Sequence, residues 1–314
     1  MLAPLRVSSA IARGWSGEGL WSAAAVGAAL GEAELLLKQG LASRHFMYTA
    51  HGRSDILLDT SATTSTTRMR ASQFFSSLER GGGSTTPHHY FTSPVETLDA
   101  SANSRLQRNA PLWERLTSTH SVDGGVRPWL QLWAGTPGVC TQAHYDVADN
   151  VFVQCWGTKE FLLYPPSAAD ALHVYPDSHP RARKSQVCLE RPDFERHPRA
   201  RKLPEPTRVV LEPGDALFIP AFHFHHVTAL TSSISLNVFS ESPIKLKAAE
   251  VLSLPPPLHS AWPVELKRRG LIELISQLLR ALQMPTLPIF LRTVRSVSNA
   301  LRNFGEKWVK HLIP

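Results

Sequence analysis

Six short runs rich in β-branched and aromatic residues lie between Trp129 and Glu241, and no helical pattern separates them. Glycine, proline and aspartate punctuate the runs, which read WLQLWAG, AHYDVADNVFVQCWG, KEFLLYPP, RVVLEPGDALFIP, FHFHHVTAL and SISLNVFSE. Strands spaced this closely, without helices between them, favour an all-β barrel or a roll of two sheets. We therefore predict a mainly β fold with a double-stranded β-helix, or jelly-roll, core. One polar insertion, from about residue 167 to 206, interrupts it.

The part of the chain before this core is expected to be an α+β addition with flexible stretches. Residues 20–40 are rich in alanine and leucine and end at a glycine, which predicts a helix. A second, short helix is expected around residues 73–79, and the glycines at 81–83 predict a flexible loop. Residues 90–126 are polar and are expected to be irregular, apart from a helical stretch near 112–116.

The chain after the core returns to a helical pattern. Residues 264–282 predict a helix with apolar side chains on all sides. Residues 290–308 predict a second helix, whose apolar side chains are three or four positions apart. These C-terminal helices could pad the barrel or form a homodimer interface, and both readings stay open. We expect three segments: 1–86, helical and flexible; 87–245, the jelly-roll domain; and 246–314, helical.

Composition excludes several classes of protein. No apolar run approaches the roughly 18 residues of a membrane-spanning helix. The three cysteines form no CxxC pair, which argues against a zinc ribbon or a disulfide scaffold and favours a reducing compartment. We therefore expect an intracellular protein, cytoplasmic or nuclear. Residues 1–17 carry two arginines, three serines and no acid, so a mitochondrial location is the alternative.

Basic residues outnumber acidic ones by 33 to 26, a formal net charge of +7. Part of the excess is local, because residues 179–202 hold eight arginines and lysines against three acids. This balance would help the chain to bind RNA or an acidic partner, but it implies neither, and a solvated surface is the simpler explanation.

The strongest chemical signal is a pair of histidine-containing motifs. His144 and Asp146 are two positions apart on an expected strand, so both side chains can point to the same face. A second cluster, FHFHH, follows at residues 222–226. Two histidines and one carboxylate form the facial triad of non-haem Fe(II) oxygenases, which leaves positions on the metal for a 2-oxo acid and oxygen. Spacing alone does not decide among the downstream histidines: His223 and His225 share one strand face, and His226 lies on the other.

The stretch from Leu130 to Ser242 resembles the JmjC family of Fe(II)- and 2-oxoglutarate-dependent oxygenases, whose cores are cupin-like jelly rolls. It is most similar to the branch that holds the asparaginyl hydroxylase of hypoxia-inducible factor, and it is similarly close to the tRNA wybutosine-synthesising hydroxylase. The residues that carry the resemblance are TQAHYDVADNVFVQCWGTKEFLLYPP, YPDSHPRARKSQVCLERPDFERHP, LEPGDALFIPAFHFHHV and SLNVF.

The resemblance implies which residues bind the metal and the co-substrate. It selects His225, five residues after Pro220, as the third metal ligand beside His144 and Asp146. His223 takes the place of a family aromatic residue and is expected to line the pocket. The residues expected to bind the distal carboxylate of 2-oxoglutarate are Lys159, Thr141 and Tyr90.

Two asparagines, Asn150 and Asn237, match residues near the co-substrate and the iron in the hypoxia-factor branch. Buried amides could instead serve only to satisfy the backbone of neighbouring strands. The N-terminal third of the chain resembles the family poorly.

We therefore expect an Fe(II)- and 2-oxoglutarate-dependent dioxygenase that hydroxylates a C–H bond. The insertion SHPRARKSQ…PDFERHP resembles the hypoxia-factor branch, which implies a protein side chain as substrate. A tRNA base is the alternative, because LQLW and HYDVADN resemble the wybutosine-synthesising enzyme. A non-catalytic JmjC scaffold acting through the C-terminal helices is the third hypothesis, and a zinc-binding cupin also remains open.

Overall fold

The computed structural model describes residues 3–7, 21–40, 44–46, 65–80, 87–98, 129–175 and 181–241. The chain divides into two compact units, one of residues 2–240 and one of residues 241–314 with Met1. The structure described below belongs to the first unit, apart from the last residue of its final strand. Among the described residues, no helix has the length and apolar character needed to cross a membrane.

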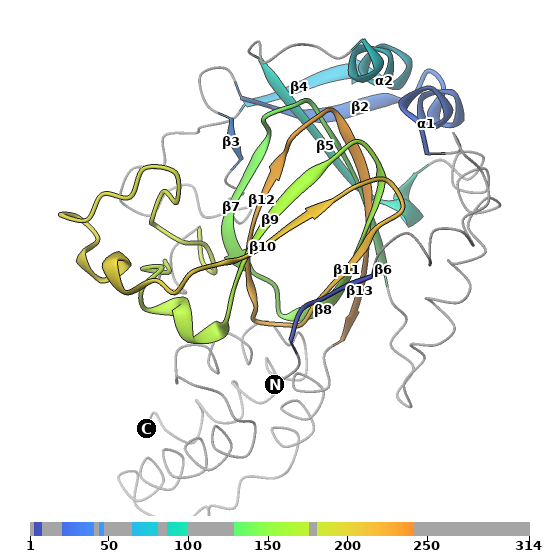
Figure 1. Ribbon diagram of the computed structural model, residues 1–314. Coiled ribbons are helices and arrows are strands. Elements are labelled where there is room, and N and C mark those ends of the chain that lie inside the picture. The colour runs from blue at the N-terminus through green and yellow to red at the C-terminus, as the bar shows by residue number, and fades with distance from the viewer. Residues whose placement is uncertain are drawn as a thin grey trace, which may run out of the picture. The chain divides into compact units, whose positions relative to one another are not determined.

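Two sheets form the core (Figure 1). The larger has eight strands in the order β1-β11-β8-β13-β6-β5-β2-β4, and the smaller has five in the order β10-β9-β12-β7-β3. The strands of the larger sheet are β1 (Leu5–Val7), β2 (Glu34–Gly40), β4 (Ser65–Arg70), β5 (His88–Pro94), β6 (Trp129–Gly135), β8 (Ala148–Trp156), β11 (Ala216–Ile219) and β13 (Ser233–Glu241). Those of the smaller sheet are β3 (His45–Phe46), β7 (Cys140–Tyr145), β9 (Lys159–Tyr164), β10 (Thr207–Leu211) and β12 (Phe224–Ala229).

Most neighbouring strands run antiparallel, and β3 joins β7 in parallel. From β7 to β13 the chain passes repeatedly between the two sheets, and its strands pair antiparallel, as in a jelly roll, so the predicted mainly β fold is confirmed. The helices are α1 (Ala23–Leu30) and α2 (Ala71–Glu79), with 3₁₀ turns η2 (Val95–Thr97), η3 (Pro166–Ala169) and η4 (Pro198–Lys202).

The two faces of the larger sheet have different chemistry. On β13, Ile234, Leu236 and Val238 join a hydrophobic core that includes residues of α1 and α2. The residues between them, among them Ser235 and Asn237, point to the opposite face, as strand alternation requires. Figure 1 shows α1 and α2 side by side next to β2 and β4. The helices thus cover one side of the sheet, and its other side carries buried polar groups such as Ser235 and Asn237.

Residues 20–40 do not form the single helix that their composition predicts. The helix α1 ends at Leu30, and Gly31 follows with a φ of 58°. The chain then forms β2, in which Leu35 and Leu37 are buried and Leu36 is 59% exposed. This alternation is the signature of a strand with one covered face, and pairing with β4 and β5 outweighs the helix propensity of the leucines.

The remaining N-terminal expectations have mixed outcomes. The helix expected at 73–79 is present as α2. The irregular stretch expected from residue 90 is wrong at its start, where β5 pairs with both β2 and β6. The loop at 81–83, the helix near 112–116 and both C-terminal helices, with any dimer interface they form, lie outside the described residues. The three-segment division remains a prediction.

The turn between β8 and β9 gives a test of the packing. Gly157 has a φ of 71°, and a Cβ atom there would lie 1.9 Å from the backbone oxygen of Ser232. Gly31 has a similar φ of 58°, but a Cβ there would meet nothing within 4 Å. We expect Gly31→Ala to lower the free energy of unfolding by about 1–3 kcal/mol, the cost of placing a residue with a side chain in a sparsely populated backbone conformation. Gly157→Ala should cost at least about 2 kcal/mol more. Urea denaturation measures both, and equal losses would contradict the close approach.

Candidate metal centre

The candidate metal ligands come from two neighbouring strands of the smaller sheet. His144 on β7 is the direct cross-strand partner of His225 on β12, and their ring centroids are 4.2 Å apart. Asp146 lies just beyond the end of β7, with its Oδ2 3.7 Å from Nε2 of His225. One ligand atom from each of the three residues lies within 4.8 Å of the other two. The geometry therefore places both imidazoles and the carboxylate around one point.

Backbone carbonyl groups orient both imidazole rings. Nδ1 of His144 lies 2.8 Å from the carbonyl oxygen of Gln142, and Nδ1 of His225 lies 3.2 Å from that of His223. Each Nδ1 can therefore donate its hydrogen to the backbone, which leaves Nε2 as the atom with a lone pair. Metal-binding histidines commonly have this arrangement, because it fixes the tautomer and the ring orientation.

The turn before β12 holds Asp146 in place. The backbone oxygen of Asp146 accepts a hydrogen bond from the amide of Phe222, which has a positive φ of 70°. The carboxylate of Asp149 accepts another from the amide of Ala221. Tyr145, which points to the opposite side of β7 from the ligands, packs its ring against that of Phe222. A backbone conformation this unusual for a bulky residue persists only where its surroundings hold it.

Burial and neighbouring charges set the protonation of the ligands. Burial lowers the pKa of His144 well below its usual range, and the nearby His225 adds to the effect. Burial alone would raise the pKa of Asp146, but His144, His225 and Arg183 outweigh it and lower that pKa below its ordinary value. At neutral pH the site therefore offers a neutral His144 beside a carboxylate, which is the state that a metal ion requires.

The three ligands open into a pocket of about 220 Å³ between the sheets. The eight residues expected to bind the metal or to lie around the co-substrate all line this pocket, although the roles given to them remain predictions. The other lining residues are Trp133, Phe152, Phe161, Arg183, Lys184, Ile219, Val227 and Phe239. His223 is not among them, which corrects the expectation for this residue. It precedes β12, and it contributes its carbonyl oxygen to His225 rather than its ring to the pocket.

A bulge in β7 brings Thr141 into the pocket. Strand alternation would put residues three apart on opposite faces. Thr141 pairs with Val227, and His144 pairs with His225. The pairs are three residues apart on β7 but only two residues apart on β12, so β7 contains one extra residue. This extra residue forms a β-bulge, and because of it the side chains of Thr141 and His144 point to the same face of the sheet. The side chain of Thr141 is hydrogen-bonded to that of Tyr90, which enters from the larger sheet.

Lys159 is a buried cation without a matching anion. It begins β9, is 2% exposed, and donates from Nζ to the hydroxyl of Ser235 at 2.8 Å. Its Nζ lies 5.2 Å from the ring centroid of Phe152 and 5.9 Å from that of Tyr90. Within the described part of the chain, no carboxylate forms a salt bridge with it. Burial lowers the pKa of Lys159 to about 7.

Two amide oxygens in the pocket wall also lack partners. The Oδ1 atoms of Asn150 on β8 and Asn237 on β13 are buried and accept no hydrogen bond from the described residues. Buried polar atoms are nearly always satisfied in folded proteins, so orphaned acceptors facing a pocket indicate a bound group.

Sequence reasoning missed two cations at the pocket, Arg183 and Lys184. The backbone of Lys184 forms a bridge with His144, and Nη1 of Arg183 lies 3.9 Å from Oδ1 of Asp146. Both residues belong to the polar insertion, and the basic run RARK was the signal that could have drawn attention to them. Burial lowers the pKa of Lys184 to about 8.

Comparisons with known proteins agree with this geometry. The model of a family described as a cupin-like domain matches residues 37–245, more than half of the chain. Among curated proteins, the tRNA wybutosine-synthesizing protein 5 of Danio rerio is 40% identical over 116 residues, which are 36% of this chain and 30% of that protein. The lysine-specific demethylase JMJ30 of Arabidopsis thaliana is 35% identical over 116 residues, 37% of this chain and 27% of that protein.

A third relative, the Jumonji C domain-containing protein 5 of Drosophila melanogaster, is 29% identical over 112 residues, 36% of this chain and 27% of that protein. The matched region thus spans less than a third of the length of each of these three relatives. The two sheets, the residues around the pocket and the family match lead to one conclusion: the chain belongs to the cupin-like domain family and is related to proteins with JmjC domains.

Proposed function

We propose that this protein is an Fe(II)- and 2-oxoglutarate-dependent dioxygenase that hydroxylates a C–H bond. The observation that carries the proposal is the combination, in one pocket, of three convergent metal ligands with a buried lysine that has no carboxylate partner among the described residues. Neither feature alone would indicate this chemistry, because the same ligands accept other divalent metals.

The residues fit an Fe(II) ion. His144, Asp146 and His225 would hold it on one face, and the backbone bonds to both Nδ1 atoms already direct the imidazoles. A 2-His-1-carboxylate set leaves open positions on iron, and iron with a 2-oxo acid and oxygen supplies the oxidising power for C–H hydroxylation.

The residues also fit a dicarboxylate co-substrate. The ammonium group of Lys159 is directed into the pocket beside Ser235, and the linked hydroxyl groups of Tyr90 and Thr141 line the same pocket. An anion here would pair with a charge already desolvated by the protein, so the electrostatic gain is larger than at a surface. Asn150 and Asn237 would supply amide groups near the metal.

The chain itself contributes orientation and the exclusion of water. Aromatic side chains enclose the pocket: Tyr90 stacks on Trp133 with centroids 5.4 Å apart, and Phe152 packs edge-on to Phe161 at 4.7 Å. Rigid walls of this kind hold reacting groups in one geometry, which is the main protein contribution to such chemistry.

A protein side chain and a tRNA base are the two substrate classes carried forward from the sequence. The names of the relatives support both, since they include tRNA wybutosine-synthesizing proteins and lysine-specific demethylases. Arg183 and Lys184 add an observation that favours tRNA, because they place two cations at the pocket. Phosphate groups are the commonest partners of such cations in RNA-binding proteins.

Anaerobic titration with Fe(II) and then 2-oxoglutarate tests the chemistry without a known substrate. We expect the visible charge-transfer band of the chelate in the wild type. His225→Ala should abolish the band by removing a ligand, and Lys159→Ala should weaken co-substrate binding. His223→Gln, which changes a neighbouring histidine outside the pocket lining, is the matched control and should retain the band. A folded wild type without the band would instead favour the scaffold hypothesis.

The substrate class can be separated by succinate formation. With total tRNA as substrate, we expect release of succinate above the background, and loss of tRNA affinity as salt rises. Arg183→Ala together with Lys184→Ala should weaken tRNA binding and make the salt dependence less steep. Stimulation by a protein extract and not by tRNA would assign the protein side chain instead.

The low pKa of Lys159 predicts how stability changes with pH. The folded pKa of about 7 is below the usual 10.5, so between these values the unfolded chain binds a proton that the folded chain does not. Raising the pH through this window therefore favours the folded state. From pH 7 to 9, we expect the free energy of unfolding of the wild type to rise by about 2 kcal/mol relative to Lys159→Met. Urea denaturation at both pH values measures it, and a constant difference would contradict the burial of this amine.

A further inference from the structure

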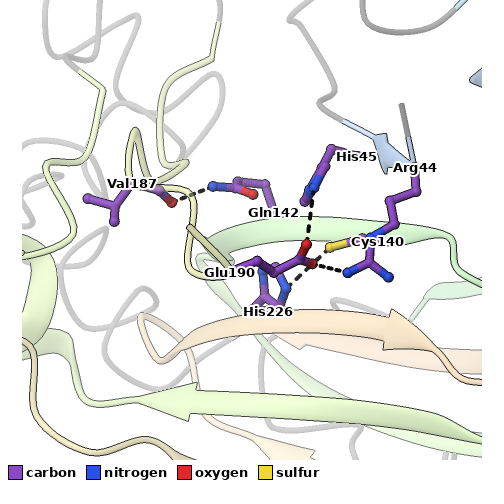
Figure 2. A network of polar contacts seen from close by, with 7 residues as sticks. All are labelled: Arg44, His45, Cys140, Gln142, Val187, Glu190 and His226. Atoms are coloured by element: carbon purple, nitrogen blue, oxygen red, sulfur yellow. Dashed lines mark hydrogen bonds and ion pairs between the residues drawn. The ribbon is translucent and has the colours of Figure 1, made fainter. Parts of the chain in front are cut away.

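A second group of side chains of the types that bind metals lies on the face of β7 and β12 that points away from the pocket (Figure 2). Cys140 on β7 and His226 on β12 are in contact, with Sγ 3.2 Å from Nε2. Their immediate neighbours, Thr141 and His225, line the pocket, whereas Cys140 and His226 do not. Strand alternation explains this, because adjacent residues point to opposite faces of a sheet.

Two further ligands reach this face from distant parts of the chain. His45 on β3 is the parallel partner of Cys140, and Glu190 comes from the polar insertion. One ligand atom each from His45, Cys140 and Glu190 lies within 4.8 Å of the other two. Figure 2 shows the imidazole of His45 directed at the carboxylate of Glu190, with Cys140 and His226 beside it. Four segments of the chain therefore bring their ligands to one place.

Arg44 orients the carboxylate without occupying both of its oxygens. Its guanidinium donates to Oε1 of Glu190, while Oε2 lies 3.7 Å from Nε2 of His45. One carboxylate oxygen is therefore directed toward the other ligands. Bonds of this kind to a ligating carboxylate are typical of metal sites, where the outer partner fixes the position of the ligand.

His226 and Cys140 form a contact between two buried side chains. His226 is 3% exposed, and its Nε2 faces the thiol of Cys140. Cys140 is fully buried as well, although Thr228 also contacts its thiol. A buried imidazole against a buried thiol forms only a weak hydrogen bond, whereas a metal ion would satisfy both groups.

We propose that Cys140, His226, His45 and Glu190 form a second metal site, selective for Zn²⁺, on the outer face of the smaller sheet. Zinc takes cysteine, histidine and carboxylate ligands in four-coordinate geometry. The thiolate distinguishes this site from the pocket, whose ligands are imidazoles and a carboxylate, because sulfur favours softer metals. An ion here joins β3, β7, β12 and the insertion.

Cobalt(II) titration of the metal-stripped full chain tests the proposal. A cobalt–thiolate bond gives a near-ultraviolet charge-transfer band, which the pocket cannot produce because its triad contains no cysteine. The titration is made in the His225→Ala background, so that the band is independent of the pocket and of the proposed oxygenase activity. We expect a band at one equivalent of cobalt, and its loss when one equivalent of zinc is added.

Three variants in this background locate the ligands. Cys140→Ser should abolish the band, whereas Cys155→Ser, a cysteine elsewhere in the fold, should retain it. Glu190→Gln changes a partly exposed side chain, so it avoids the folding risk of the buried cysteine, and it should weaken zinc binding by about 10–100-fold. A folded chain without the band, a band that survives Cys140→Ser, or unchanged affinity in Glu190→Gln would overturn the proposal.

Discussion

The pairing of β7 with β12 is the interaction on which the rest of the site depends. It places His144 opposite His225, and the bulge in β7 carries Thr141 to the same face. The backbone carbonyl group two positions before each histidine, in Gln142 and His223, then orients the ring. Among the described residues, no other element supplies a histidine to the pocket lining, so the register of one strand pair determines whether the proposed metal ligands converge. A slip of one residue would turn His226 inward and His225 outward.

The strands of the larger sheet contribute to two environments. One face joins the hydrophobic core, and the other forms a wall of the pocket. Leu130, Leu132 and Ala134 on β6 join the core with the helices, and Trp133 between them lines the pocket. β13 repeats the pattern. The apolar packing on the other face of this sheet offsets the cost of burying polar residues such as Asn237 in the pocket wall.

The parts of the site that depend on local pattern could be predicted from the sequence. The two-residue spacing of His144 and Asp146 follows from strand geometry, and a family resemblance extended the set to Lys159 and the asparagines. All of these residues meet in one pocket. Arg183 and Lys184 were missed because their position depends on how the insertion folds back on β7, which no local pattern records. The strand β2 was mistaken for helix because leucine suits both, and its neighbours in the sheet decide between them.

The turn at Phe222 requires both a positive φ and a large side chain that packs beside Tyr145, and no single amino acid suits both. Its backbone, with a φ of 70°, would be relaxed with glycine, which would remove the ring that packs beside Tyr145. Any other large side chain could replace the ring but would carry the same backbone strain. This turn also binds the backbone of Asp146, so we expect few substitutions to be tolerated at Phe222, although its side chain does not line the pocket. In a designed variant of this scaffold, Phe222 is therefore a position to leave unaltered while the specificity of the pocket is changed around it.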